Sequence, residues 1–198
     1  MGFAPRLLFI TFVVAALSSA VSADTSKFDG LTGDPQLRSA SAIVLGSDGN
    51  VIYEKDVDAV RSIASITKLM TAMVVLDAQL DLDEKITITK ADRDLIRMTG
   101  SRLEPGATLS RRELLLLALM SSENRAATAL GRTYPGGMEK FVAQMNRKAK
   151  DLGMGNSKFS DPAGLHTNNL STASDLARMI AAAEHYPLIT QATTTVEQ

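Results

Sequence analysis

The spacing of hydrophobic positions changes along the chain and predicts strands first and helices afterwards. Residues 41–45 form a short apolar run, residues 46–50 have the composition of a turn, and residues 51–54 are again rich in β-prone side chains. This arrangement is typical of an antiparallel hairpin. Residues 85–89 alternate between polar and apolar side chains, which predicts one further short strand.

A helical pattern begins at Ser65 and dominates the rest of the chain. Residues 65–80 are apolar on nearly every side of a helical wheel, which predicts a buried central helix with Ser65 at or near its first turn. Later helices are expected over 110–120, 125–130, 138–152 and 171–186. Ser110 and Glu113 have the spacing of a capping box, and Pro187 is expected to end the last helix. Because strands precede a helical block without regular alternation, the pattern predicts an α+β fold.

The N-terminal segment has the layout of a secretory signal peptide. Arg6 is followed by an apolar run over 7–17, and small residues fill the end of the segment up to Ala23. The run is shorter than the roughly 20 residues of a membrane-spanning helix, although an uncleaved anchor is the alternative. We therefore expect a signal peptide over 1–23, export of the mature chain, and one domain over 24–198.

Composition argues against several classes of function. The chain has 21 basic and 22 acidic residues, and its net charge of −1 gives no reason to expect nucleic acid or an anionic surface as a partner. It contains no cysteine, which excludes disulfides and thiolate chemistry. His166 and His185 have no His or Cys partner at zinc-binding spacing, so we expect neither a metal nor another cofactor.

The strongest chemical signal is the pair Ser65 and Lys68. On a helix, a spacing of three residues places both side chains one turn apart on the same face. A serine hydroxyl needs a base within hydrogen-bond reach, and burial of the lysine would favour the neutral amine that can accept the serine proton. The helix N-terminus would also stabilise an oxyanion beside Ser65. The alternative is coincidence, because Ser and Lys are common residues.

A second polar group, Ser122 and Asn124, separates two apolar helical segments. Its side chains could project into a cleft, or they could only cap a helix end. Ser65-x-x-Lys68 and Ser122-x-Asn124 each occur once in the sequence. Together they resemble the first two of three motifs that are shared by the penicillin-binding proteins and the serine β-lactamases.

The surrounding sequence resembles one branch of these proteins more closely. Residues 61–72 are similar to the low-molecular-mass D-alanyl-D-alanine peptidases, and residues 120–127 resemble their penicillin-binding protein 7 type endopeptidases. The resemblance extends from Ser39 to the end of the chain. It implies a helical lobe packed on an antiparallel sheet, a periplasmic location, peptidoglycan peptides as substrates and β-lactams as inhibitors.

The resemblance also implies a role for each residue of the two motifs. Ser65 would attack a D-alanyl carbonyl and form an acyl-enzyme, with Lys68 as the general base. Ser122 would relay a proton to the leaving amine, and Asn124 would orient Lys68 and bind the substrate amide. An endopeptidase would cut the cross-link between stem peptides, whereas a carboxypeptidase would cut the terminal D-Ala–D-Ala bond.

One part of the family pattern is absent from the sequence. The third motif, Lys-Thr-Gly, does not occur in the 198 residues, and in the family it lies on a later strand of the sheet. We therefore expect that the C-terminal strands, which would pair with the hairpin at 41–54, are missing. Two rival functions follow: a non-catalytic cell-wall-binding homologue, or a β-lactamase, which would need a further group to activate water.

Overall fold

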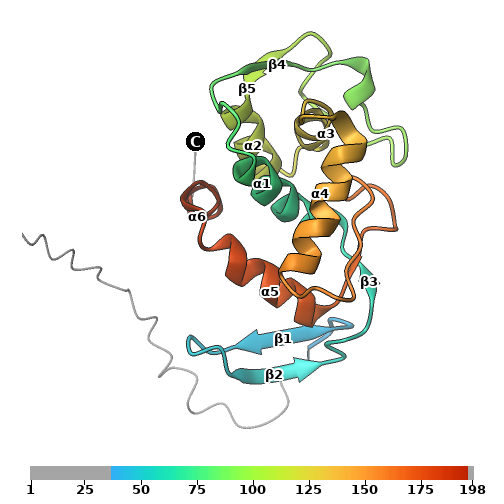
Figure 1. Cartoon of the computed structure of the whole chain (residues 1–198). Helices are drawn as coiled ribbons and strands as arrows, with labels where there is room; N and C mark the ends of the chain where they lie inside the picture. The colour runs from blue at the N-terminus through green and yellow to red at the C-terminus, as the bar shows by residue number, and fades with distance from the viewer. Residues whose placement is uncertain (1–36, 196–198) are drawn as a thin grey trace, which may run out of the picture.

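The computed structural model describes residues 37–195, and the predicted signal peptide lies outside them. Helices surround one central helix, and a β-hairpin lies at one end of the molecule (Figure 1). The helices are α1 (Thr67–Asp77), α2 (Arg111–Met120), α3 (Asn124–Arg132), α4 (Gly137–Asp151), α5 (Ala173–Ala183) and α6 (Pro187–Thr194). The strands are β1 (Ala42–Leu45), β2 (Val51–Lys55), β3 (Arg61–Ser62), β4 (Lys85–Thr87), β5 (Thr108–Ser110) and β6 (Leu170–Ser171). The predicted α+β fold class is confirmed.

The central helix α1 is buried because its residues are apolar on nearly all sides, as the sequence pattern predicts. Met70, Met73 and Val75 are completely buried, and α1 packs against α2, α3, α4 and α5. Each fully buried aliphatic side chain stabilises the fold by about 1.5–3 kcal/mol. Lys68 lies in the first turn of this helix, so its position is determined by the packing of the core.

The strands among residues 37–195 form three separate antiparallel pairs. β1 pairs with β2 as the predicted hairpin, and the predicted strand β4 pairs with β5. β3 pairs with β6, which places the segment before Ser65 beside residues 170–171. β3, β5 and β6 were not predicted from the sequence, because strands of two or three residues are too short to show an alternating pattern.

Most helix boundaries differ from the prediction by one to three residues, and two of these differences are informative. Ser65 lies in a short 3-10 turn, η2 (Ala64–Ile66), and α1 begins only at Thr67. The prediction that Pro187 ends the last helix is wrong: α5 already ends at Ala183, and Pro187 begins a further helix, α6, because a proline at the first helical position loses no hydrogen bond. The capping box at α2 is confirmed: the side chains of Ser110 and Glu113 accept from each other's backbone N–H.

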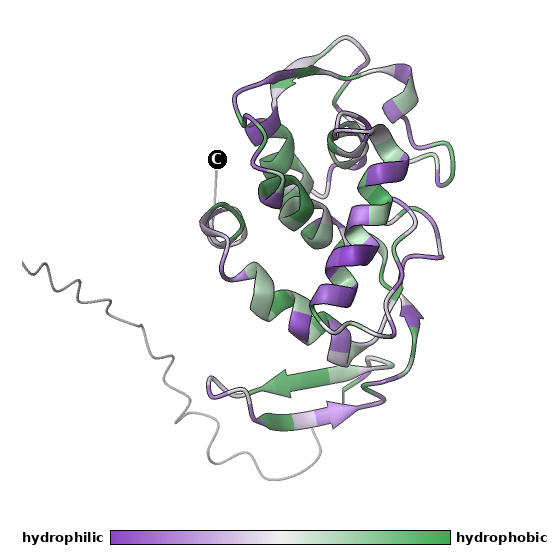
Figure 2. Ribbon diagram, in the orientation of Figure 1, coloured by the Kyte–Doolittle hydropathy of each residue, from purple (hydrophilic) through white to green (hydrophobic). Residues whose placement is uncertain are grey.

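The β1–β2 hairpin lies apart from the main helical core. β1 contacts α5, and both strands carry hydrophobic residues (Figure 2). Several of these side chains are exposed, namely Val44, Leu45, Val51 and Ile52. No helix within residues 37–195 has the length and apolar character needed to cross a membrane.

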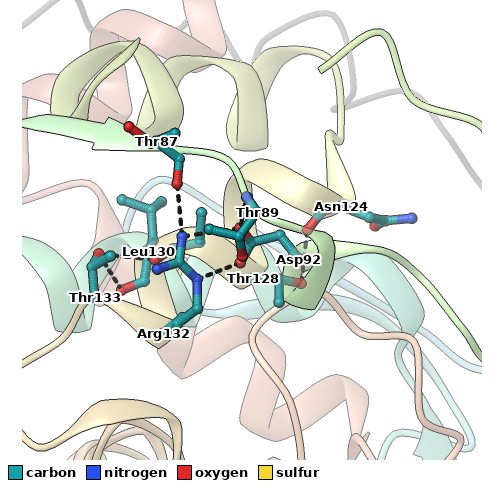
Figure 3. A network of polar contacts seen from close by, with 9 residues as sticks. Thr87, Thr89, Asp92, Asn124, Thr128, Leu130, Arg132 and Thr133 are labelled. Carbon is teal, nitrogen blue, oxygen red and sulfur yellow. Dashed lines mark hydrogen bonds and ion pairs between the residues drawn. The ribbon is translucent and has the colours of Figure 1, made fainter. Parts of the chain in front are cut away.

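An ion pair at the C-terminal end of α3 fixes the helix that begins with Asn124. Arg132 donates to both carboxylate oxygens of Asp92, at 2.8 and 2.9 Å, and to the carbonyl oxygen of Thr87 at 2.9 Å (Figure 3). The Asp92 side chain is completely buried and also accepts from Thr89. Because a two-bond arginine–carboxylate pair fixes orientation, it joins α3 to β4 and to the 3-10 turn η3 (Lys90–Asp92).

Candidate active site

The amine of Lys68 lies at the centre of the predicted site. Its Nζ atom is 3.1 Å from Ser65 Oγ and 3.2 Å from Ser122 Oγ. It is 2.7 Å from Asn124 Oδ1 and 2.8 Å from the carbonyl oxygen of Ala163. The structure thus brings together all four residues of the two predicted motifs, and it adds a backbone carbonyl that was not predicted from the sequence.

The hydrogen-bond partners of Lys68 determine which of the three non-carbon positions around its Nζ atom can exchange a proton. Carbonyl oxygens can only accept, so the contacts with Asn124 and Ala163 each require an N–H of the amine. Besides its bond to carbon, the nitrogen has three positions, so one remains for the two serine hydroxyls. Loss of a proton there leaves a lone pair directed toward Ser65 and Ser122. The cluster can therefore transfer a proton between the amine and a serine hydroxyl.

Burial changes the protonation of Lys68. The residue is only 2% exposed, and burial lowers the pKa of Lys68 to about 8, while the negative charges of Asp161 and Glu123 act to raise it. The expectation that the lysine is desolvated is therefore met. With a pKa one unit above neutral pH, about a tenth of the amine is neutral at pH 7 and able to accept a proton.

Both serines of the cluster are exposed, and each is associated with an unusual backbone conformation. Ser122 has φ of 53°, and Ala64, the residue before Ser65, has φ of 45°. The left-handed conformation costs roughly 1–2 kcal/mol for a residue other than glycine. Such conformations persist only where the surrounding structure stabilises them, and they are concentrated at functional sites.

The helix-capping alternative does not describe the side chains of Ser122 and Asn124. The N-cap of α3 is Glu123, whose carboxylate accepts from the Arg125 N–H at 3.0 Å. The same carboxylate oxygen accepts from the Ser101 hydroxyl at 2.8 Å. Because Glu123 caps the helix, its two neighbours are free to contact Lys68.

A loop over residues 161–166 presents the Ala163 carbonyl to Lys68. One carboxylate holds this loop, since Asp161 accepts from the backbone N–H groups of Ala163, Gly164, Leu165 and His166 and from the side chain of Asn169. Burial acts to raise the pKa of Asp161, but these hydrogen bonds outweigh it and lower the pKa below its usual range. The sequence predicted only a turn here, because a backbone carbonyl has no signature of its own.

Comparison with known proteins agrees with the predicted resemblance. Residues 30–198 match the family model described as D-alanyl-D-alanine carboxypeptidase. The chain is 47% identical over 196 residues to a D-alanyl-D-alanine endopeptidase of Pseudomonas aeruginosa, covering 98% of this chain and 63% of that protein. It is 45% identical over 192 residues to a D-alanyl-D-alanine endopeptidase of Escherichia coli, covering 96% and 60% respectively. The chain thus spans less than two thirds of the length of these relatives.

Solved structures share the fold. A Streptomyces DD-transpeptidase matches with a TM-score of 0.74 at 30% identity, covering 81% of this chain and 66% of that one. A D-alanyl-D-alanine carboxypeptidase from Mycobacterium tuberculosis matches with a TM-score of 0.73 at 30% identity, covering 84% and 64%. Because the family model matches most of the sequence and the structural matches agree with it, the chain belongs to the D-alanyl-D-alanine carboxypeptidase family.

Proposed function

We propose that the protein is a serine-type D-alanyl-D-alanine peptidase that acts on peptidoglycan peptides through an acyl-enzyme on Ser65. The observation that carries this proposal is the position of Lys68 Nζ, which lies within hydrogen-bond distance of both Ser65 Oγ and Ser122 Oγ. A nucleophile, a partly neutral amine and a second hydroxyl are thereby within the reach that proton transfer requires.

In the proposed acylation step, neutral Lys68 takes the proton of Ser65 as Oγ attacks the carbonyl carbon of the D-alanyl bond. The backbone N–H of Ser65 stabilises the resulting oxyanion. The protonated amine then passes a proton through the Ser122 hydroxyl to the leaving nitrogen, and the C–N bond breaks. The acyl group remains on Ser65 as an ester, which water hydrolyses with Lys68 again as the base.

Among peptidoglycan peptides, we propose that cross-linked stems are the substrate. The two relatives described above are endopeptidases, at 47% and 45% identity. An enzyme of this type cuts between the D-Ala of one stem and the diamino acid of its neighbour. Because peptidoglycan lies outside the cytoplasmic membrane, we also propose a periplasmic location. β-Lactams, which resemble the acyl donor, are expected to acylate Ser65.

Covalent labelling with a fluorescent penicillin tests the assignment. The wild type should be labelled and Ser65→Ala should not, because the ester oxygen is absent. Ser62→Ala is the matched control, since Ser62 lies on β3 outside the cluster and should not affect labelling. Labelling of the Ser65→Ala variant at the level of the wild type would refute the proposal.

The lifetime of the label and the products distinguish the rival functions. A peptidase should hold the penicilloyl group for many minutes, a β-lactamase should release it rapidly, and a non-catalytic homologue should never acquire it. Mass spectrometry of purified muropeptides then separates the two peptidase activities. An endopeptidase converts cross-linked dimers to monomers, whereas a carboxypeptidase removes one alanine from pentapeptide monomers.

A further inference from the structure

The amide of Asn124 is held on both sides by hydrogen bonds. Its Oδ1 atom accepts from Lys68 at 2.7 Å, and its Nδ2 atom donates to Thr99 Oγ1 at 2.9 Å. The Thr99 hydroxyl in turn donates to Asp94 Oδ2 at 2.7 Å. Asp94, Thr99, Asn124 and Lys68 thus form one continuous chain of hydrogen bonds, although neither Asp94 nor Thr99 belongs to either motif.

Asp94 determines which atom donates and which accepts in each of these hydrogen bonds. Its carboxylate also accepts from the backbone N–H groups of Ile96, Arg97 and Thr99. Burial acts to raise the pKa of Asp94, but these hydrogen bonds and the Thr99 hydroxyl outweigh it and lower the pKa to about 2. The ionised carboxylate has no proton to donate, so the single hydroxyl proton of Thr99 is committed to Asp94. The Thr99 oxygen can then only accept from Asn124.

The orientation of the amide matters because it decides where the lone pair of Lys68 points. With Oδ1 toward the amine, one N–H is used on Asn124 and another on Ala163, and the lone pair of the neutral amine faces Ser65. With Nδ2 toward the amine, the amide would donate to the lone pair. The base would then be directed at Asn124 and away from the nucleophile.

We propose that Thr99 and Asp94 are positioning residues for acylation, because they lock the Asn124 amide in the orientation that directs the lone pair of Lys68 at Ser65. The inference rests on the proposed role of Lys68 as the general base. It assigns a function to the loop over residues 94–99, whose Asp94 is buried and whose Thr99 is the link to the motif.

Substitutions at Thr99 test the proposal, since they separate the hydroxyl from the shape of the loop. Thr99→Val keeps the backbone N–H that binds Asp94 and removes only the hydroxyl, whereas Thr99→Ser restores a hydroxyl. The pKa of Lys68 is measured by NMR with 13Cε-labelled lysine, with Lys68→Arg for assignment. The rate of Ser65 acylation by penicillin is measured in parallel.

In Thr99→Val, the pKa of Lys68 should fall, because an amide N–H that faces the amine stabilises its neutral form. The limiting acylation rate should fall about three- to tenfold, since the lone pair is misdirected in part of the molecules. Thr99→Ser should return both values to those of the wild type. The charged groups that face Lys68, Asp161 and Glu123, are unchanged in both variants.

An unchanged pKa and rate in Thr99→Val would overturn the proposal, as would a Thr99→Ser variant that behaves like Thr99→Val. A purely structural role for Thr99 would lower the thermal unfolding midpoint without moving the pKa of Lys68, which also contradicts it. If the wild type is not acylated but its Lys68 pKa responds to Thr99→Val, the peptidase assignment fails while the hydrogen-bond chain is supported.

Discussion

Gly164 packs so closely against the carbonyl oxygen of Ala64 that a β-carbon at Gly164 would overlap this oxygen. Both residues have left-handed backbone, with φ of 78° and 45° respectively. The nitrogen of Ser65 would lie 3.0 Å from the same β-carbon. The loop that presents Ala163 to Lys68 is therefore in direct backbone contact with the segment that carries Ser65, the proposed nucleophile.

Gly164→Ala should displace either the loop or Ser65. We expect acylation to slow by about a hundredfold, since small misplacements of reacting groups have effects of this size. The free energy of unfolding should fall by about 3 kcal/mol, from left-handed backbone and steric overlap together. Penicillin acylation and urea unfolding measure the two effects.

Substitutions at two other glycines distinguish the cost of the steric overlap with Ala64 from the cost of a left-handed φ. Gly153 has φ of 71° but open space around its β-carbon position, and Gly155 has open space without a left-handed φ. Gly153→Ala should lose about 1 kcal/mol and Gly155→Ala almost nothing, both with normal acylation. Equal losses at Gly153 and Gly164 would mean that the close approach to Ala64 has no energetic effect.

The acylation rate of the wild type should rise with pH and level off above about pH 8. In the proposed mechanism Lys68 accepts the Ser65 proton only in its neutral form, and burial lowers the pKa of Lys68 to about 8. Below that pH the neutral fraction, and with it the rate, falls about tenfold per unit. Stopped-flow acylation across a pH series measures the midpoint. A midpoint near the ordinary lysine pKa of 10.5 would contradict the desolvated base.

Asp161→Asn should move this pH profile to lower pH and reduce its plateau. The charge of Asp161 acts to raise the pKa of Lys68, so its removal lets burial lower that pKa further. An amide also has only one acceptor oxygen, which leaves part of the Ala163 loop without its hydrogen bonds. We expect a plateau about tenfold lower. Asp151→Asn, which changes an exposed carboxyl at the end of α4, is the control and should leave the pH profile unchanged. A midpoint of Asp161→Asn at higher pH than that of the wild type would contradict the proposed effect of the Asp161 charge.

Arg132→Met should lower the free energy of unfolding by about 2–4 kcal/mol, because it leaves the buried carboxylate of Asp92 without its charged partner. Arg112→Met is the matched control: Arg112 lies 3.8 Å from Asp83, and both side chains are largely exposed. Its effect should stay below about 0.5 kcal/mol. Urea unfolding followed by circular dichroism compares the two, and similar losses would show that the Asp92 pair does not stabilise α3.

Local spacing explains why the first half of the site could be predicted from the sequence. Ser65 and Lys68 lie three residues apart, so their contact depends only on helical geometry. Ser122 and Asn124 were identified through their motif, and the structure places both against Lys68. Their catalytic roles stay predictions until labelling and substitution are measured.

The remaining members of the site depend on contacts between distant parts of the chain. Ala163 meets Lys68 across 95 positions and through a backbone atom that every residue has. Thr99 meets Asn124 across 25 positions, and an isolated threonine in a loop has no distinguishing pattern. Tertiary packing, which single-sequence periodicity does not describe, brings these groups to the site.

The elements of the fold also differ in whether local sequence or tertiary contacts determine them. α1 and the β1–β2 hairpin could be predicted, because helical periodicity and turn composition are local properties. The β3–β6 pair joins Arg61–Ser62 to Leu170–Ser171. A strand of two residues can be recognised only through its pairing with another strand, so neither could be predicted from the sequence. The start of α1 at Thr67 instead of Ser65 likewise reflects the strained turn at Ala64, which is stabilised by the fold around it.

At Ser122, the residue that suits the backbone best differs from the residue that the proposed chemistry requires. Glycine would suit a φ of 53° better than serine, yet it would remove the hydroxyl that faces Lys68. Laboratory selection for heat resistance alone should therefore enrich glycine at this position, while selection for peptidoglycan cleavage should retain serine. Recovery of glycine under the first regime and serine under the second would show that stability and the proposed chemistry favour different residues at this position.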